Sequence, residues 1–525
     1  MVAVRGSASF LLLGSCWLLL VGATPAKSGH SEFYTSVTNM AYLVESEQHI
    51  LQRLDKYIRL AEEKIRFLRR QKEKLMVDIG EALADKVGYV SNPINAFLLT
   101  RRFLVHYRKL DELMQMGLGV QLIDDSSMVP SDADYNGVVE ALGRLQETYQ
   151  LDTAELAGGK IRGRTVSREL TAEECYKIGA ALSKDEGIVY ATSWLREALR
   201  RWTLGDTSGV SKSEILAYLS YTIFMDGNYE EALSVVKQLL KLDPTHEEGL
   251  KRKETIENWL KYVEVHGPAP RSVKPEWSLY KPLCRGEHQR PVAESSMLRC
   301  RYERSKSPFI RIAPFKLEEL SLDPLIVLYH DVVSDGEIKQ LIVMGKPLLK
   351  RSMVGEGPES REISTSRTSQ NSWLKDYDHP VVQRLTLRAA DMSGLNMRAA
   401  EELQVNNYGI GGHYLPHYDW TQEKTEGYMG MGNRIATLMF YLSDVEQGGA
   451  TVFPRLGVGV FPKKGSAIFW YNLHHNGTGD DRTLHGACPV LQGSKWVANK
   501  WVREFHQEFL RPCELSSGST SNDSK

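Results

Sequence analysis

Apolar residues recur every seven positions between residues 32 and 77. The two seams of this repeat carry Val37, Val44, Leu51, Ile58 and Ile65 on one side and Met40, Leu54, Ala61, Leu68 and Leu75 on the other. Glu47 and Lys72 interrupt the seams, and the stretch contains no Gly or Pro. The spacing favours a coiled coil, and the uninterrupted length favours pairing between two chains. An amphipathic helix that packs on its own domain is the alternative.

Residues 170–257 show the pattern of paired helices. The segment from Tyr218 through Gly227 to Pro244 follows the tetratricopeptide (TPR) helix-turn-helix pattern, and residues 175–199 repeat it more weakly. Two or three such pairs form a small concave surface that suits a peptide. Tyr218 and Tyr221 share one helical face and suit the proline rings of an extended peptide. Plain packing between helices is the alternative for both.

Short apolar runs rich in β-branched and aromatic residues fill the C-terminal part of the chain. Residues 435–442, 448–454 and 467–471 predict strands, separated by turn sequences such as Lys-Lys-Gly at 463–465. Several short strands at this spacing are typical of a barrel or a jelly roll. The sequence therefore predicts a C-terminal domain built around β-strands, after the helical regions.

Metal-capable side chains accompany these predicted strands. His417 and Asp419 lie two residues apart, so on a strand they point to the same face, and His485 is a candidate third ligand. Two histidines and one carboxylate form a facial triad that leaves positions open and suits non-haem Fe(II). Lys495 follows on the next predicted strand and could bind a carboxylate. A lone His-x-Asp is a chance occurrence in most proteins, whereas this ordered set is much less common.

Length and charge narrow the class of protein. The chain has 525 residues, enough for more than one domain, and its formal net charge of −1 argues against a nucleic-acid-binding protein. Residues 1–23 have the pattern of a secretory signal peptide, with Arg5 before an apolar run that is too short for a membrane span. An N-terminal anchor is the alternative, and no other membrane span is predicted. The C-terminus carries no Lys-Asp-Glu-Leu-type retention signal.

The motifs around the candidate metal ligands resemble a known family. They comprise residues 407–409 (Asn-Tyr-Gly), 413–419 (His-Tyr-Leu-Pro-His-Tyr-Asp), 432–437, 448–454 and 495–501. This set resembles the 2-oxoglutarate/Fe(II) oxygenase fold and, over nearly the whole chain, the alpha subunit of collagen prolyl 4-hydroxylase.

The resemblance implies a multidomain α+β protein that ends in a double-stranded β-helix (jelly-roll) oxygenase domain. The expected order is a signal peptide (1–23), an N-terminal helical dimerisation domain (24–160), a TPR-like all-α peptide-substrate-binding domain (165–262), a linker with a disulfide (263–325), the catalytic domain (326–513) and a polar tail (514–525).

The same resemblance implies the activity and the roles of the site residues. The activity is hydroxylation of C4 of proline in collagen-like X-Pro-Gly peptides, coupled to decarboxylation of 2-oxoglutarate to succinate and CO2. The cofactors are Fe(II), 2-oxoglutarate, O2 and ascorbate. The residues implied are His417, Asp419 and His485 for iron, Lys495 with Tyr408 and Thr437 for 2-oxoglutarate, and Tyr414, Arg434, Trp501, Tyr218 and Tyr221 for the peptide.

The chain departs from the family pattern at four positions. Arg503 stands where many members have a histidine near the cosubstrate, and arginine cannot act as a proton donor in the way that histidine can. Ser183 and Thr255 stand where tyrosines are expected, and Glu248 where an arginine is expected. We therefore expect altered turnover or 2-oxoglutarate affinity, and altered peptide preference.

The cysteines and sequons fit a chain of the secretory pathway. Cys16 leaves with the signal peptide, and we expect Cys284 to pair with Cys300 and Cys488 with Cys513, with Cys175 free. The family pattern supports these pairs, although the sequence alone allows others. Asn476 and Asn522 lie in glycosylation sequons.

The resemblance also implies a partner and a compartment. Members assemble as α2β2 heterotetramers with protein disulfide isomerase, which carries the retention signal for the endoplasmic reticulum lumen. Two other interpretations stay open: a 2-oxoglutarate oxygenase that acts on other peptidyl residues, and an inactive collagen-binding module. Oxygenases of the lysyl or hypoxia type usually hold the distal carboxylate with arginine, whereas this chain has Lys495.

Overall fold

The computed structural model describes residues 37–118, 132–183, 188–266, 278–287, 290–354, 364–409, 411–421 and 430–514. The predicted signal peptide and Asn522 lie outside these residues. The chain divides into two compact units, residues 1–79 and 80–525. Across the described residues, no helix combines the length and the apolar character that crossing a membrane requires.

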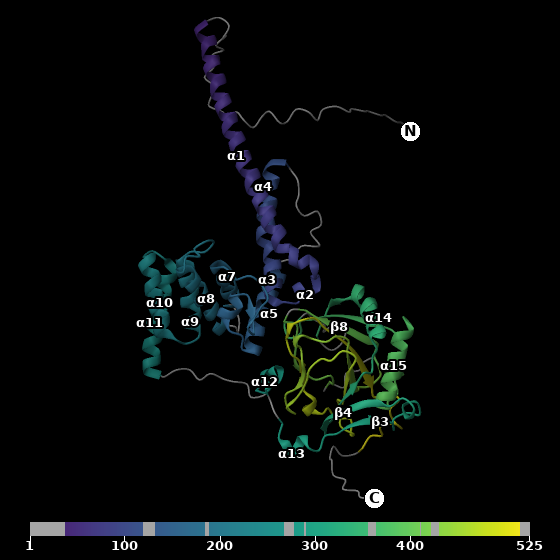
Figure 1. Cartoon of the computed structure of the whole chain (residues 1–525). Coiled ribbons are helices and arrows are strands. Elements are labelled where there is room, and N and C mark those ends of the chain that lie inside the picture. Colours follow the sequence, from purple (N-terminus) through teal and green to yellow (C-terminus); the bar gives the residue numbers. More distant parts are fainter. Residues whose placement is uncertain are drawn as a thin grey trace, which may run out of the picture. The chain divides into compact units, whose positions relative to one another are not determined.

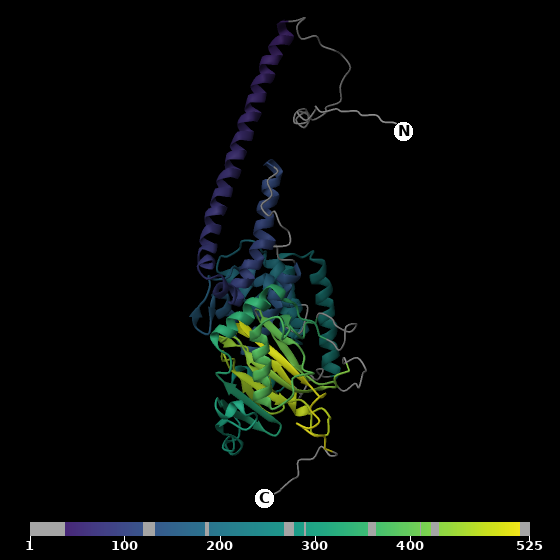
Figure 2. The same cartoon turned by 90° about the vertical axis from the view of Figure 1, so that its right-hand side faces the viewer.

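The first unit is dominated by the long helix α1 (Val37–Ala84), which Figure 2 shows as one continuous rod. The predicted heptad stretch is therefore helical from Val37 onward. Leu51, Ile58 and Ile65 on its seam are between 46% and 56% exposed. An exposed apolar seam of this kind is the surface by which a helix pairs with another helix.

The second unit begins with short helices around α5 (Asp132–Tyr149). The other elements here are α2 (Lys86–Val90), α3 (Pro93–Arg101), the π-helix η2 (Arg102–Tyr107), α4 (Arg108–Leu118), α6 (Thr153–Ala157) and the β1–β2 hairpin (Lys160–Ile161, Arg164–Thr165). Asn92 caps α3 by accepting from the backbone N–H groups of Ile94 and Asn95, with Pro93 at the first helical position.

The predicted helical pairs between residues 170 and 257 are confirmed. They are α7 (Ala172–Leu182), α8 (Ile188–Thr203), α9 (Lys212–Met225), α10 (Tyr229–Leu242) and α11 (Glu247–His266), and Figure 1 shows them side by side. Capping boxes at Thr171–Glu174 and Ser211–Glu214 start α7 and α9. Each helix packs on the next through a buried apolar face, which includes Trp194, Leu216 and Val236.

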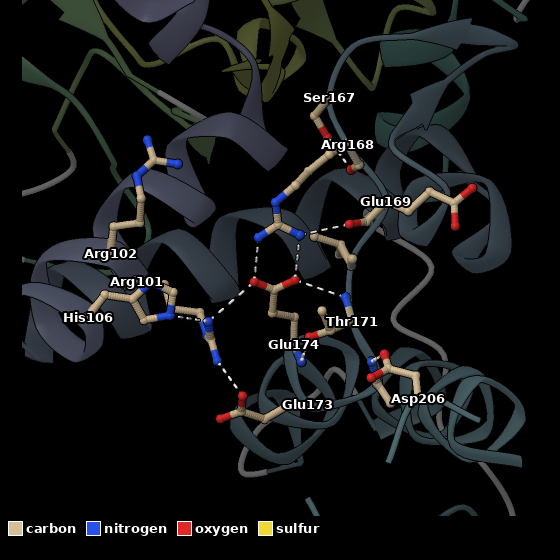
Figure 3. Close-up of polar contacts among 12 residues, drawn as sticks. Arg101, Arg102, His106, Ser167, Arg168, Glu169, Thr171, Glu173, Glu174 and Asp206 are labelled. Atoms are coloured by element: carbon tan, nitrogen blue, oxygen red, sulfur yellow. Dashed lines mark hydrogen bonds and ion pairs between the residues drawn. The ribbon is translucent and has the colours of Figure 1, made fainter. Parts of the chain in front are cut away.

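A buried carboxylate links these helical pairs to the preceding helices. Figure 3 shows Glu174 at the start of α7 between Arg168, which binds both of its oxygens, and Arg101 of α3. Arg101 also pairs with Glu173 at 2.8 Å. Burial favours the neutral form of Glu174, but the hydrogen bonds and charge of Arg168 outweigh it and hold its pKa below the usual value. Because losing one partner would leave a buried charge unpaired, this network fixes α7 against α3.

Two facing sheets form the C-terminal domain. Among the described residues, the larger sheet has the strand order β3-β4-β5-β14-β10-β17-β8-β7-β6 and the smaller one β13-β12-β15-β9. The strands are β3 (Cys300–Glu303), β4 (Phe315–Leu322), β5 (Leu325–His330), β6 (Lys350–Arg351), β7 (Gln370–Leu374), β8 (Leu403–Tyr408), β9 (Tyr414–His417), β10 (Arg434–Tyr441), β11 (Gln447–Gly448), β12 (Thr451–Phe453), β13 (Val458–Val460), β14 (Ala467–Tyr471), β15 (His485–Ala487), β16 (Val490–Gln492) and β17 (Lys495–Arg503). The strands predicted at 435–442 and 467–471 correspond to β10 and β14.

Alternate residues of the central strand β10 pack into two different hydrophobic cores. Leu438 and Phe440 pack under the helices α14 (Asp335–Gly345) and α15 (Pro380–Ser393), which lie along the sheet in Figure 1. Met439 and Tyr441 belong to the other core, with residues of both sheets such as Phe453 of β12. This period of two covers one face of the sheet with helices and turns the other toward the smaller sheet.

The disulfide pairing expected from the sequence is wrong. Cys284 of α12 (Tyr280–Arg285) is bonded to Cys488, at a Cα–Cα distance of 5.5 Å, and Cys300 and Cys513 are exposed free cysteines. The reason is that α12 packs in the same core as Ala450, Val452 and Cys488. The two cysteines are 204 residues apart in the sequence, so no local pattern indicates that they meet. Cys175 is free and buried, as expected.

Candidate metal centre and cosubstrate pocket

The structure brings together the three predicted metal ligands. His417 ends β9, Asp419 lies two residues beyond it, and His485 begins β15, directly opposite His417 in the antiparallel register. One ligand atom from each side chain lies within 4.8 Å of the other two. Asp419 lies 3.8 Å from Nε2 of His417 and 3.6 Å from Nε2 of His485. The donor set and its compactness fit one divalent ion.

Hydrogen bonds aim both imidazoles at the centre of this cluster. Nδ1 of His417 lies 2.8 Å from the Leu415 carbonyl, and Nδ1 of His485 lies 3.0 Å from the Thr483 carbonyl. A carbonyl only accepts, so Nδ1 carries the proton and Nε2 keeps its lone pair for a metal. Burial and the neighbouring His485 lower the pKa of His417 to about 3, so this ring is neutral near pH 7.

Asp419 is held by a chain of polar groups from two strands. The Thr437 hydroxyl of β10 donates to Asp419 at 2.8 Å, and the Asn472 side chain donates to Thr437 at 2.9 Å. Burial would raise the pKa of Asp419, but its electrostatic interactions with the two neighbouring imidazoles and with Arg434 hold the pKa below its usual value. Thr437, predicted to contact the cosubstrate, thus donates a hydrogen bond to a metal ligand, and no sequence motif pointed to Asn472.

Lys495 is fully buried in the same domain as this cluster. It begins β17 opposite Tyr408 of β8, is 0% exposed, and its Nζ has no hydrogen-bond partner among the described residues. The ammonium lies 5.1 Å from the centre of the Tyr408 ring. Burial lowers the pKa of Lys495 to about 7. A buried cation without an anion is costly, so the pocket fits a carboxylate of a small ligand.

Two aromatic contacts involve the residues predicted for the peptide side, and one of them is with a metal ligand. Tyr414 stacks on His417 with ring centres 3.6 Å apart, and the guanidinium of Arg367 lies 4.8 Å from the Tyr414 ring. Arg434 lies 3.9 Å over the Trp501 ring. These contacts place Tyr414 against a metal ligand and Arg434 against Trp501, whereas Arg367 had no signal in the sequence.

Arg503, which departs from the family pattern, is part of an ion-pair network. It pairs with Glu401 at 2.7 Å and donates to the Gly432 carbonyl, while Arg434 binds both oxygens of Glu401. Arg503 and Arg434 thus share the carboxylate of Glu401, and the buried guanidinium of Arg503 helps to hold that carboxylate against Arg434. His506, three residues further along the chain, is exposed and has a left-handed backbone conformation.

The helical region contacts the back of the metal-ligand strand. Tyr280 of α12 is buried and donates to the Ala487 carbonyl of β15 at 3.2 Å. From α5, Tyr149 donates to the Pro489 carbonyl and Arg144 to the Gly411 carbonyl. These bonds support the segment that follows His485 and the segment that precedes β9, from outside the C-terminal domain.

The two tyrosines predicted for peptide binding differ in accessibility. Tyr218 of α9 is 40% exposed and meets Tyr176 of α7 edge to face. Tyr221 is half-buried, with the guanidinium of Arg252 lying 5.4 Å from its ring. Arg252 also donates to Ser220 and lies 3.7 Å from Glu248. The sequence pattern gave no indication of Arg252 at this surface.

The structure also locates Ser183 and Thr255, which differ from the family pattern, and the sequon at Asn476. Ser183 is buried and bonds to the Ala180 carbonyl, whereas Thr255 is exposed on α11. Asn476 lies in the turn between β14 and β15, where its side chain accepts from the Thr478 backbone and hydroxyl. Its glycosylation stays a prediction.

The fold and site define a class of protein. Residues 403–503 match the 2OG-Fe(II) oxygenase superfamily, residues 36–163 the N-terminal region of the prolyl 4-hydroxylase alpha-subunit, and residues 172–262 the prolyl 4-hydroxylase peptide-substrate-binding domain. Fe(II) and 2-oxoglutarate are the cofactors that this class implies, and the His-Asp-His cluster and the Lys495 pocket fit them.

Relatives narrow the class further. Human prolyl 4-hydroxylase subunit alpha-1 is 38% identical over 95% of this chain and 99% of its own length, and chicken subunit alpha-2 is 38% identical over 95% and 98%. The chain belongs to the prolyl 4-hydroxylase alpha-subunit family. A crystal structure of a viral collagen prolyl hydroxylase from Paramecium bursaria Chlorella virus-1 is 27% identical, with a TM-score of 0.28, and covers 34% of this chain and 95% of that chain.

Proposed function

We propose that this chain is the catalytic subunit of a procollagen-proline 4-dioxygenase. It hydroxylates C4 of proline in collagen-like X-Pro-Gly peptides and couples this to the decarboxylation of 2-oxoglutarate to succinate and CO2. The observation that carries the proposal is the His417–Asp419–His485 cluster beside the unpaired, buried Lys495, in a member of this family.

The side chains of the site have separate proposed roles in binding the metal and the cosubstrate. His417, Asp419 and His485 hold Fe(II), which with 2-oxoglutarate supplies the activation of O2 when bound. Lys495 binds the distal carboxylate of the cosubstrate, with Tyr408 beside it, and Thr437 orients Asp419. Ascorbate maintains the metal in its reduced state.

Tyr414, Arg434 and Trp501 form the wall on which the substrate peptide lies. Tyr414 covers His417, and Arg434 stacks on Trp501 under the restraint of Glu401 and Arg503. In the helical pairs, Tyr218 offers an open aromatic face for proline rings. Both surfaces suit an uncharged, extended peptide.

A coupled assay tests the proposal. The full chain, co-expressed with protein disulfide isomerase, is given Fe(II), ascorbate, 2-oxoglutarate and a Pro-Pro-Gly repeat peptide, and succinate and 4-hydroxyproline are both measured. We expect equal amounts of the two products, and a loss of more than about 100-fold in His417→Ala, Asp419→Ala and His485→Ala, because each removes a ligand of a catalytic metal. His475→Ala, an exposed histidine of the same domain, serves as the control.

The other outcomes identify the rival functions. Peptide binding without succinate would indicate a collagen-binding module, and succinate without 4-hydroxyproline would indicate an oxygenase for another residue. Substantial hydroxylation by any of the three ligand variants would refute the metal assignment.

The proposal extends to the arrangement of the chain. We infer a secretory signal at 1–23, a dimerisation domain at 24–160 that pairs through a coiled coil of α1, a peptide-binding domain at 165–262, a linker at 263–325, and a double-stranded β-helix at 326–513 before the tail at 514–525. The exposed seam of α1 and the two facing sheets support these assignments. Asn476 and Asn522 are the proposed glycosylation sites.

The proposed assembly is an α2β2 heterotetramer with protein disulfide isomerase in the lumen of the endoplasmic reticulum. Exposed apolar surface such as the α1 seam promotes association when it is uncovered. The chain expressed alone should therefore aggregate or be inactive, whereas co-expression should yield a soluble tetramer on size-exclusion chromatography with light scattering. A soluble, active chain without the isomerase would contradict this assembly but not the chemistry.

A further inference from the structure

The two strands that carry the histidine ligands pair irregularly next to His485. His485 lies opposite His417 and Ala487 lies opposite Tyr414, so β9 has two residues between its paired positions where β15 has one. A β-bulge of this kind interrupts the ladder of hydrogen bonds and re-aims the neighbouring side chains. The pairing of β9 with β15 alone therefore does not fix the direction of the segment that follows His485.

Tyr280 of α12 packs against this irregular position. Its hydroxyl donates to the Ala487 carbonyl at 3.2 Å, and a Cβ at Gly486 would lie 3.3 Å from its ring. Tyr280 is 3% exposed, and burial raises the pKa of its phenol, so the hydroxyl stays a donor at neutral and moderately alkaline pH. One side chain of α12 thus contacts both residues that follow the metal ligand.

Tyr149 of α5 holds the same segment two residues further on. Its hydroxyl donates to the Pro489 carbonyl, and burial raises the pKa of this phenol as well. Cys284, one turn after Tyr280 on α12, is bonded to Cys488. Three successive residues of the segment are therefore bonded to helices that precede the C-terminal domain.

The helix that carries Tyr149 is itself held from the other side. Gln146, one turn before Tyr149 on α5, accepts a hydrogen bond from the indole of Trp194 on α8, and both of these side chains are fully buried. Buried polar contacts that are fully paired rigidify the elements that they join. Because α5 is anchored in the helical region, the Tyr149 hydroxyl is a fixed point against which the segment rests.

We propose that Tyr280 and Tyr149 are positioning residues for the iron centre: their hydroxyl groups fix the segment after the bulge and, through it, the direction in which His485 presents Nε2 to the metal. The inference rests on the proposed function. Groups that orient metal ligands without binding the metal contribute to metal affinity, because a ligand held in the wrong direction has to reorient when the metal binds.

Metal binding without turnover provides the test. The isomerase-bound full chain with Tyr280→Phe, and separately with Tyr149→Phe, is stripped of metal and compared with the parent. Titration with Mn(II), followed by EPR, gives a dissociation constant, and the absorption spectrum with Co(II) reports the geometry of the ligands. We expect each variant to raise the Mn(II) dissociation constant about 10-fold and to shift the Co(II) bands, because each loses a group that orients a ligand. The KM for the Pro-Pro-Gly peptide should stay unchanged.

Tyr329→Phe is the matched control. Tyr329 of β5 is also buried, its hydroxyl donates to the backbone carbonyl of Met392 at 2.7 Å, and burial raises its pKa. It belongs to the core under α14 and α15. Its substitution should lower the melting temperature about as much as Tyr280→Phe does, since both lose one buried hydrogen bond, while the Mn(II) affinity and the Co(II) spectrum stay those of the parent.

Each other result has a defined meaning. The proposal is overturned if both variants bind Mn(II) as tightly as the parent and give its Co(II) spectrum. An equal loss of affinity in Tyr329→Phe would attribute the effect to general destabilisation, which also overturns it. Should Tyr280→Phe not fold, Tyr149→Phe decides the question by itself. A parent that binds Mn(II) but forms no 4-hydroxyproline with Fe(II) would refute the proposed function instead.

Discussion

Lys495 holds a positive charge in a place that favours the neutral amine. Its Nζ has no hydrogen-bond partner among the described residues, it faces the ring of Tyr408, and burial lowers its pKa to about 7. The charged form therefore destabilises the folded protein until an anion enters the pocket. This arrangement should increase the affinity for a dicarboxylate, because the bound carboxylate offsets the free-energy cost of the buried, unpaired ammonium.

Lys495→Met should stabilise the protein while it abolishes cosubstrate binding. The folded-state pKa is lower than the unfolded one, so between about pH 7 and 10.5 the unfolded chain binds more protons and this group makes stability rise with pH. Removing the group should therefore add about 1–3 kcal/mol at or below pH 7, and progressively less toward pH 10.5.

Scanning calorimetry of the metal-free protein at several pH values checks this expectation. Added 2-oxoglutarate should raise the melting temperature of the parent but not that of the variant. Lys464→Met, at an exposed ion pair with Asp335, is the matched control. A variant less stable than the parent at pH 6 would show that Lys495 has a stabilising partner.

At the scale of elements, two strands and one turn present the metal ligands. His417 and His485 face one another across β9 and β15, and Asp419 follows on a bend whose next residue is the buried Trp420. Gly479, before β15, lies against that indole, so a Cβ there would come within 2.3 Å of it. The contact between Gly479 and Trp420, neither of which is a metal ligand, thus packs the two ligand segments against each other.

Gly479→Ala should impair the metal site through Trp420. The added methyl group forces the indole and the adjacent Asp419 to shift, so we expect about a 10- to 100-fold loss of turnover and about 1–3 kcal/mol of stability. Apparent Fe(II) affinity and denaturant unfolding are the measurements. Gly336→Ala on α14, where a Cβ meets nothing within 4 Å, is the control. Unaltered Fe(II) affinity and turnover would show that the site tolerates the shift.

The sequence predicted the elements and ligands that local patterns encode. The heptads, the helical pairs, β10, β14 and the His-x-Asp spacing are all periodicities of neighbouring residues. Glu401, Asn472 and Arg252 were missed because they reach their partners across 33, 35 and 31 residues, through register and packing that no local pattern reports. The cysteine pairing failed for the same reason, since α12 docks beside Cys488 only in the folded core.

Disulfide mapping should find Cys284 joined to Cys488. Non-reducing digestion and mass spectrometry of the oxidised assembly should yield that one cross-linked pair among the cysteines of the described residues. Cys284→Ser should cost about 2–4 kcal/mol of stability, because the link closes a long loop in the unfolded chain. Cys300→Ser should be nearly neutral. Recovery of Cys284–Cys300 and Cys488–Cys513 peptides would contradict the structure.

At the scale of the whole molecule, the residues that we propose for catalysis and those that we propose for assembly lie in different units of the chain. The metal cluster, Lys495 and helices α7 to α11 all belong to residues 80–525, whereas the exposed seam positions of α1, from Leu51 to Ile65, belong to residues 1–79. A chain that needed its partner subunit to complete the active site would be expected to have a ligand or the Lys495 charge missing. The described residues contain the whole set.

Pairing through α1 should therefore be separable from chemistry. Ile58→Lys with Ile65→Lys puts two charges into the seam, and like charges facing each other across a helix pair destabilise it, so the two α chains should dissociate. Light scattering on the isomerase-bound protein should show half the parent mass, with kcat per α chain within about twofold of the parent. Leu60→Lys adds a charge at an exposed apolar position of the same helix outside the seam, and should leave the assembly whole. If the double variant keeps the parent mass, α1 does not hold the two α chains together. If the double variant loses both mass and activity while the Leu60 variant loses neither, the activity of the catalytic unit depends on pairing.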